Sequence, residues 1–191
     1  MAETAQTETL AINGGPAAWA DKSSDLLGLP PGAAMIDQEE ERLVLESLRS
    51  RRLFRFGSGD NFLHRVNTLE AEWQQAFGVN HALAVASGTS ALACGLVALG
   101  VGPGDEVIVP AYTYVATAAA VVSVGAVPII AEVDESLTLD PADTERKITP
   151  RTKTIIPVHM RGTPCAMDKF MDIARRHKLT VLEDVAQACG G

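Results

Sequence analysis

The spacing of hydrophobic positions divides the chain into a helical first part and an alternating remainder. Asp37, followed by Glu40 three residues later, has the pattern of a capping box and predicts a helix that ends near Ser50. A second helix is predicted to end at Gly78, because an apolar stripe with helical spacing precedes this glycine. The stripe consists of Val66, Leu69, Trp73 and Phe77.

Short apolar runs alternate with helical patterns in the rest of the chain. Strands are predicted at residues 81–86, 106–109, 127–133, 153–158 and 179–183. Helices are predicted between them at residues 88–99 and 114–124, in a short segment from 141, and at residues 166–177. Asp140 and Pro141 are suited to cap and to open the short helix. This alternation predicts an α/β fold with a mostly parallel sheet flanked by helices.

Two further segments bear on the domain organisation. Residues 1–36 show little periodicity and are predicted to form an N-terminal arm, whereas residues 37–191 are predicted to belong to one domain. The stretch from 107 to 131 carries no charge and is long enough to span a membrane. However, Pro110 and Pro128 divide it into strand, helix and strand, and buried parallel strands have this composition. No membrane segment is predicted.

Composition and charge narrow the possible functions. The chain has 191 residues, a net charge of −8 and a pI of about 5.0, which argues against a general nucleic-acid binder. Cys94, Cys165 and Cys189 form no CxxC pair, so neither a metal site nor a disulfide framework is predicted. The first residues lack the pattern of a signal peptide. A reducing, cytoplasmic location is therefore expected.

A turn of small residues follows the first predicted strand. Ser87, Gly88, Thr89 and Ser90 lie where a helix begins, and the first amides of a helix have no internal partner. Such amides bind phosphate, so Thr89 and Ser90 are candidate phosphate ligands. A capped helix start without any ligand is the alternative.

Aromatic and acidic residues follow two later predicted strands. Tyr114, in the turn that also holds Tyr112, is suited to stack on a flat heterocycle, unless it packs between helix and sheet. Asp184 can keep a pyridinium nitrogen protonated, with Gln187 three residues later near a ring hydroxyl, unless Asp184 only caps a helix. A protonated ring is the better electron sink in pyridoxal phosphate chemistry. His159 also lies at a strand end and is expected to support a loop.

With these features at successive strand ends, the chain resembles the N-terminal half of the DegT/StrS-type sugar aminotransferases, a branch of the fold-type I pyridoxal-phosphate enzymes. The matching motifs are Ile12–Pro16, Ser87–Leu92, Gly102–Pro110, Thr113–Thr117, Gly125–Pro128 and Glu183–Ala188. The resemblance implies that the amides of Thr89 and Ser90 hold the cofactor phosphate. It also implies that Tyr114 stacks on the pyridine ring, that Asp184 pairs with the ring nitrogen, and that Gln187 contacts the ring hydroxyl.

The resemblance further implies a homodimeric aminotransferase. Such an enzyme moves an amino group from glutamate or glutamine to a keto-sugar or keto-cyclitol in amino-sugar or antibiotic biosynthesis. Two alternatives remain open: a pyridoxal-phosphate-dependent sugar dehydratase of the same family, in which a histidine replaces the lysine, and a truncated module without catalysis.

The chain departs from the family pattern in its lysines. The Schiff-base lysine of the family is expected beyond the end of this chain, together with the later strands of the large domain and the small C-terminal domain. No catalytic residue is assigned, and the chain alone is expected to be inactive. The lysines present, none in a motif-like context, are Lys22, Lys147, Lys153, Lys169 and Lys178.

Overall fold

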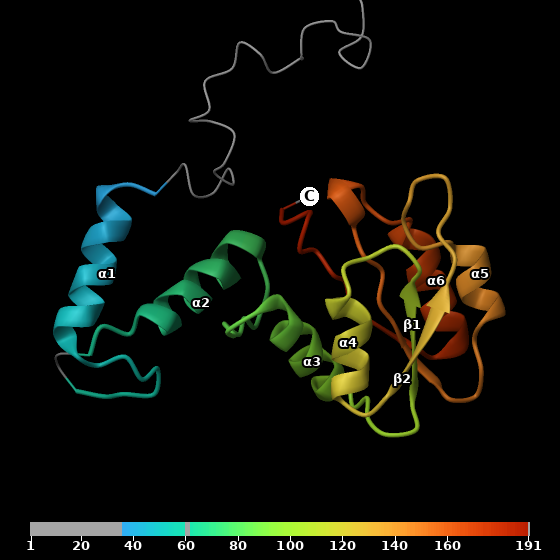
Figure 1. Cartoon of the computed structure of the whole chain (residues 1–191), viewed down its shortest axis with the longest axis horizontal. Helices are drawn as coiled ribbons and strands as arrows, with labels where there is room; N and C mark the ends of the chain where they lie inside the picture. The colour runs from blue at the N-terminus through green and yellow to red at the C-terminus, as the bar shows by residue number, and fades with distance from the viewer. Residues whose placement is uncertain (1–35, 60–61, 191) are drawn as a thin grey trace, which may run out of the picture. The chain divides into compact units, whose positions relative to one another are not determined.

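The computed structural model describes residues 36–59 and 62–190 (Figure 1). The chain divides into two compact units, Met1–His64 and Arg65–Gly191. The predicted arm, residues 1–36, lies outside the described residues except for Ile36, so it stays a prediction.

The first unit contains one described helix, α1 (Gln38–Ser50). Asp37 caps it as predicted: its Oδ1 accepts a hydrogen bond from the Glu39 amide at 2.7 Å, and Glu40 Oε2 accepts from the Asp37 amide at 2.9 Å. Both contacts satisfy amides that the helix itself leaves without acceptors. None of the described residues of this unit is buried, so the unit has no apolar core among them.

The second unit is built on a parallel sheet with the strand order β2-β1-β3-β4. The strands are β1 (Glu106–Pro110), β2 (Val127–Ala131), β3 (Thr152–Ile155) and β4 (Thr180–Val181). All five residues of β1 are buried, as expected for a central strand covered on both faces. The predicted α/β class and four of the five predicted strands are confirmed.

Helices cover both faces of this sheet (Figure 1). They are α3 (Gly88–Ala98) and α4 (Ala116–Ser123) on one face, and α5 (Pro141–Arg146) and α6 (Met167–His177) on the other. Val107 and Val109 of β1 belong to the cluster under α3 and α4, whereas Ile108 belongs to the cluster under α6. Since alternate residues of a strand face opposite sides, β1 contributes to both cores.

The segment 81–86 is not a strand, so this prediction is wrong. It follows α2 (Arg65–Phe77), which Gly78 ends with a φ of +63°, and it pairs with none of the described strands. The amide of Ala84 donates instead to Glu70 Oε1 on α2 at 2.7 Å, and Leu83 remains 65% exposed. Apolar character alone does not make a strand, because a strand also needs a neighbour for its backbone hydrogen bonds.

The uncharged stretch from 107 to 131 folds as strand, helix and strand, as predicted. Its helix α4 begins at Ala116, so Tyr114 lies in the preceding loop and not in the helix. Among the described helices, none has the length and apolar composition needed to cross a membrane.

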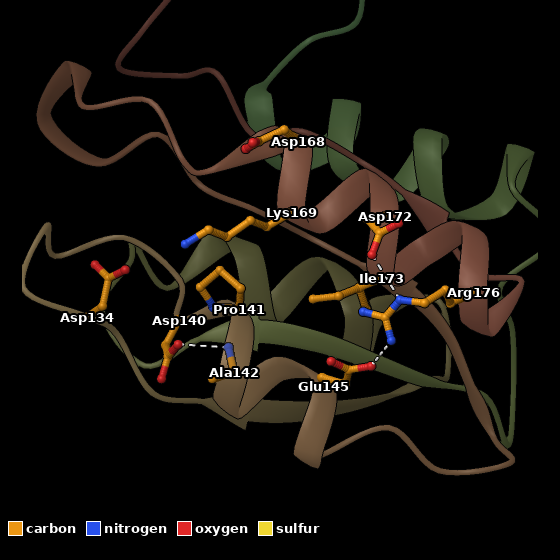
Figure 2. A pocket seen from close by; sticks show the side chains of 10 residues that line it. All are labelled: Asp134, Asp140, Pro141, Ala142, Glu145, Asp168, Lys169, Asp172, Ile173 and Arg176. Carbon is orange, nitrogen blue, oxygen red and sulfur yellow. Dashed lines mark hydrogen bonds and ion pairs between the residues drawn. The ribbon is translucent and has the colours of Figure 1, made fainter.

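Charged residues line a groove of about 510 Å³ between α5 and α6 (Figure 2). Arg176 lies between Glu145 of α5 and Asp172 of its own helix, where its Nε is 2.9 Å from Asp172 Oδ2. His177 Nε2 lies 2.9 Å from Glu145 Oε1. Hydrogen bonds from Arg176, and then from His177, lower the pKa of Glu145 to about 2. The groove is therefore lined by ion pairs that join α5 to α6.

Replacing Glu145 with glutamine is expected to destabilise the fold at neutral pH and to have a much smaller effect near pH 2. The pKa of Glu145 is depressed in the folded state, so the ionised carboxylate stabilises the fold above its ordinary pKa of 4.5. This contribution is lost as the pH falls towards about 2. Urea midpoints of both proteins across this range measure the difference.

The matched control for this prediction is Glu135→Gln. Glu135 is exposed and makes no ion pair within the described parts of the chain, so its substitution should shift the urea midpoint little at any of these pH values. A Glu145→Gln effect that stays constant from neutral pH down to pH 2 would contradict the assigned ion pairs.

Candidate functional site

The order of the strands identifies the edge of the sheet where a ligand is expected. Strand β1 lies between β2 and β3, and the helix that follows β1 covers the opposite face from the helix that follows β3. The two connections therefore leave the sheet on opposite sides, which opens a crevice at the carboxyl ends of these strands. Open α/β sheets bind ligands at such a switch point.

The amino end of α3 holds the first two predicted residues. Ser87 caps this helix: its Oγ accepts from the Ser90 amide at 3.1 Å and lies 2.9 Å from Ser90 Oγ. The amides of Gly88 and Thr89 have no acceptor within the helix, because helical amides bond four residues back. Both the capped start and the open amides are present. The binding of phosphate by Thr89 and Ser90 stays a prediction.

Tyr114 lies in the loop between β1 and α4. Its side chain is 71% exposed, and within the described residues no other ring stacks on it. It is therefore not packed between helix and sheet, the arrangement considered as the alternative. An exposed aromatic ring at the carboxyl edge is available to a flat ligand.

Asp184 follows β4 at the same edge and accepts a hydrogen bond from Thr117, which Thr113 supports in turn. Thr117 of α4 is fully buried, and its Oγ1 donates to Asp184 Oδ2 at 3.2 Å. Thr113 Oγ1 lies 2.8 Å from Thr117 Oγ1. Because the only hydroxyl proton of Thr117 goes to the carboxylate, Thr113 donates to Thr117. The hydroxyls thus form a directed chain that ends on Asp184.

The other carboxylate oxygen of Asp184 accepts from the Ala186 amide at 3.1 Å. Within the described residues no lysine, arginine or histidine forms an ion pair with Asp184. The predicted alternative, a helix cap, is not seen, since the described residues after Asp184 form turns. A half-buried carboxylate without a cation is suited to a positively charged ligand group.

Gln187 is fixed by the loop between β3 and α6. This loop contains the 3-10 helix η4 (Met160–Gly162), and the Arg161 amide donates to Gln187 Oε1 at 2.6 Å. With its oxygen engaged, the Gln187 side chain presents its NH₂ group as the remaining hydrogen-bond donor. This polarity agrees with a contact to a ring hydroxyl, the role predicted for Gln187.

Three functional contacts were not predicted from the sequence: those of Thr113, Thr117 and the Arg161 backbone. The two threonines are only four residues apart, Thr113 in the loop before α4 and Thr117 in its first turn, so their contact is a local one. The contact of Arg161 with Gln187 had none, because it depends on a loop that approaches from another strand.

The described lysines contact groups outside the candidate site. Lys147 donates to the Ile130 carbonyl at 2.6 Å, Lys153 lies 3.3 Å from Asp105 Oδ2, and Lys178 ends α6 before β4. Lys169 lines the groove between α5 and α6 (Figure 2). None of the lysines in residues 36–59 and 62–190 contacts Asp184 or Gln187.

Thr117→Val is expected to lower the free energy of unfolding by about 1–3 kcal/mol, because it removes a buried donor to a charged acceptor. Valine has a similar shape, so the loss reports the hydroxyl and not the volume. Urea denaturation measures it. Thr117→Ser is the control. It keeps the hydroxyl that donates to Asp184, so its free energy of unfolding should fall less than that of Thr117→Val. Equal stabilities of Thr117→Val and the unmodified chain would refute this hydrogen-bond chain.

Known proteins are similar to this chain in sequence and in fold. The chain is 42% identical over 172 residues to GDP-perosamine synthase of Caulobacter vibrioides, a match that covers 87% of this chain and 44% of that protein. It is 52% identical over 123 residues to UDP-N-acetyl-3-dehydro-alpha-D-glucosamine 3-aminotransferase of Acidithiobacillus ferrooxidans, which covers 64% of this chain and 33% of that protein. The chain therefore spans less than half the length of these relatives.

A solved structure shows the cofactor of such proteins. NtdA of Bacillus subtilis, with bound cofactor PMP, matches with a TM-score of 0.73 and 36% identity over 85% of this chain and 37% of that chain. A proposed sugar aminotransferase of Streptococcus pneumoniae in its PLP form matches with a TM-score of 0.67 and 28% identity over 78% of this chain and 41% of that chain. The cofactor of the family is pyridoxal 5′-phosphate, as predicted. The residues present fit this group, because Asp184 is a carboxylate without a cationic partner among the described residues and Tyr114, which follows β1 at the same edge of the sheet, is exposed.

The resemblance found in the sequence motifs is confirmed over most of the chain. Residues 34–191 match the model of the DegT/DnrJ/EryC1/StrS aminotransferase family. The parallel sheet between two layers of helices is the fold of the matching structures. This chain belongs to the DegT/DnrJ/EryC1/StrS aminotransferase family.

Proposed function

We propose that this chain forms the cofactor-binding part of an aminotransferase that acts on a keto-sugar or keto-cyclitol, with glutamate or glutamine as the amino donor. The observation that carries the proposal is the Asp184 carboxylate, which is oriented by Thr117 and has no cationic partner among the described residues. The sugar aminotransferases among its relatives support the reaction type.

Each residue of the site has a separate role in this proposal. Asp184 holds a proton on the ring nitrogen of the cofactor, and Thr117 keeps the carboxylate in place. Gln187 donates its NH₂ group to the ring hydroxyl, while Tyr114 covers the ring face. The Thr89 amide binds the phosphate at the amino end of α3, and the Ser90 amide joins it by exchanging Ser87 Oγ for a phosphate oxygen.

Bound pyridoxal phosphate supplies an electron sink for the transfer of a proton at the substrate carbon. The contribution of this chain is electrostatic. A carboxylate held before the cofactor arrives stabilises the protonated ring without reorganising, which is how preformed groups lower reaction barriers. We propose that the covalent anchor of the cofactor is none of the described lysines, and that this chain alone is therefore inactive.

We further propose that the complete enzyme is a cytoplasmic homodimer. The three cysteines are free, which suits a reducing compartment. The described residues of the first unit expose apolar side chains without a core of their own, and a second copy would cover such a surface. Sedimentation of the complete gene product tests the dimer.

The reaction itself is tested with the complete gene product, pyridoxal phosphate, an amino donor and a panel of keto-sugars and keto-cyclitols. An aminated product in the mass spectrum is expected. A deoxygenated keto-sugar without nitrogen would instead indicate the dehydratase, which the sugar aminotransferases named above do not favour. The absence of either product with every acceptor would refute the proposed function.

A further inference from the structure

We propose that His159 is a positioning residue that fixes the loop bearing Arg161 to the end of β4, and thereby presents Asp184 and Gln187 together. The inference deepens the proposed function and rests on it for the role of these two residues. His159 follows β3 and is only 6% exposed. A buried imidazole with two polar nitrogens needs a partner for each of them.

The contacts of His159 determine its tautomer. Its Nδ1 accepts a hydrogen bond from the Cys165 amide at 3.0 Å, so this nitrogen carries no proton. The proton of the neutral ring is therefore on Nε2, which lies 3.1 Å from Glu183 Oε2 and donates to it. One side chain thus joins its own loop, six residues on, to the residue that precedes Asp184.

The loop after His159, between β3 and α6, contains two residues in an unfavourable backbone conformation. Arg161 has a φ of +55° and Gly162 a φ of +80°, so two successive residues are left-handed. This conformation costs a non-glycine residue free energy and persists only where the surroundings hold it.

The Cys165 side chain adds a second contact at the end of this loop. Burial raises the pKa of the Cys165 thiol, which stays protonated and donates to the Val158 carbonyl at 3.2 Å.

The same loop is tied to the site by its backbone. The His159 amide donates to the Asp184 carbonyl at 3.1 Å, and the Asp184 amide donates to the Pro157 carbonyl at 2.9 Å. The Arg161 amide then reaches the Gln187 side chain at 2.6 Å. Because His159 holds both ends of this arrangement, its loss should release Arg161 from Gln187.

A different result is expected if His159 only fills space in the core. In that case its removal would lower stability in general and leave the Arg161 amide as protected as the other amides of the unit. A positioning role predicts a local change, confined to the loop after β3 and to the end of β4.

Amide hydrogen exchange of the chain tests the proposal directly. His159→Ala is expected to speed exchange of the Arg161 and Cys165 amides about 10-fold or more, relative to the amides of β1. His159→Asn retains an acceptor near Nδ1 and should restore protection at Cys165. The control is His177→Ala on the surface of α6, which should leave both amides unchanged. Unchanged exchange at Arg161 in His159→Ala would overturn the proposal.

Cofactor affinity provides the second readout. In the complete gene product, His159→Ala is expected to raise the Kd for pyridoxal phosphate about 10-fold, because Gln187 loses its support. His159→Gln, which can still reach Glu183, should lie between. A Kd within about two-fold of the unmodified protein would overturn the proposal even if the melting temperature fell.

The two readouts separate this inference from the proposed function. If the unmodified protein binds no pyridoxal phosphate, the proposed function fails, while the exchange measurement still decides whether His159 holds the loop. If His159→Ala does not fold, Glu183→Ala replaces it, because Glu183 is exposed and its removal deletes only the contact with Nε2. Unchanged exchange at Arg161 in Glu183→Ala would then count against the proposal.

Discussion

Asp184→Asn is expected to lower kcat of the complete enzyme about 100-fold or more. Asparagine has the shape of aspartate and still accepts the hydrogen bond from Thr117, so the local fold is retained. It carries no charge, however, and cannot stabilise a protonated ring nitrogen. Removal of one preformed electrostatic group from an active site typically costs a factor of about 10²–10³.

Steady-state kinetics with saturating cofactor, amino donor and acceptor measure this effect. Saturation ensures that weaker cofactor binding does not account for the loss. The matched control is Asp168→Asn, since Asp168 is an exposed aspartate at the start of α6 that does not contact the site. A kcat of Asp184→Asn within about three-fold of the unmodified enzyme would show that Asp184 does not act on the ring.

Phe170→Ala is expected to lower the free energy of unfolding by about 3–5 kcal/mol. Phe170 lies on α6, is 0% exposed, and belongs to the cluster that also contains Ile108 of β1 and Leu139. Removal of its ring loses burial and leaves a cavity that the packed strands cannot close. Domains are stable by only about 5–15 kcal/mol, so this single change uses a large share of that margin.

Urea denaturation measures the loss as a lower midpoint at an unchanged slope. The neighbouring substitution Met171→Ala provides the control, because Met171 is 48% exposed on the same helix and should cost less than about 1 kcal/mol. Equal effects of the two substitutions would mean that α6 does not pack on the sheet through Phe170.

Local patterns predicted much of the fold. Asp37 and Asp140 were predicted as helix caps, and both side chains accept from the first turn of the following helix. Gly78 was predicted to end α2 and has the left-handed φ that such a position requires. These features depend on neighbours within one or two turns, so their spacing in the sequence is sufficient to identify them.

The positions of the candidate site residues were predicted in part, whereas their roles stay a prediction. Tyr114, Asp184 and Gln187 were expected at the carboxyl edge of the sheet because each follows a strand end, and the parallel sheet places them there. The prediction of a strand at residues 81–86 was wrong because a strand depends on a neighbour that the local sequence does not reveal. That segment has the apolar character of a strand, but no described strand lies beside it to accept its hydrogen bonds.

The sequence by itself determined most of the helix boundaries, the alternation that gives a parallel sheet, and the residue types of the candidate site; the start of α4 at Ala116 was not among them. Only the tertiary structure decided how those residues are held. Thr117 meets Asp184 across 67 positions of sequence, and His159 meets Glu183 across 24. Contacts of this kind arise from the strand order β2-β1-β3-β4, which local spacing does not encode, because it is fixed by which faces the helices bury.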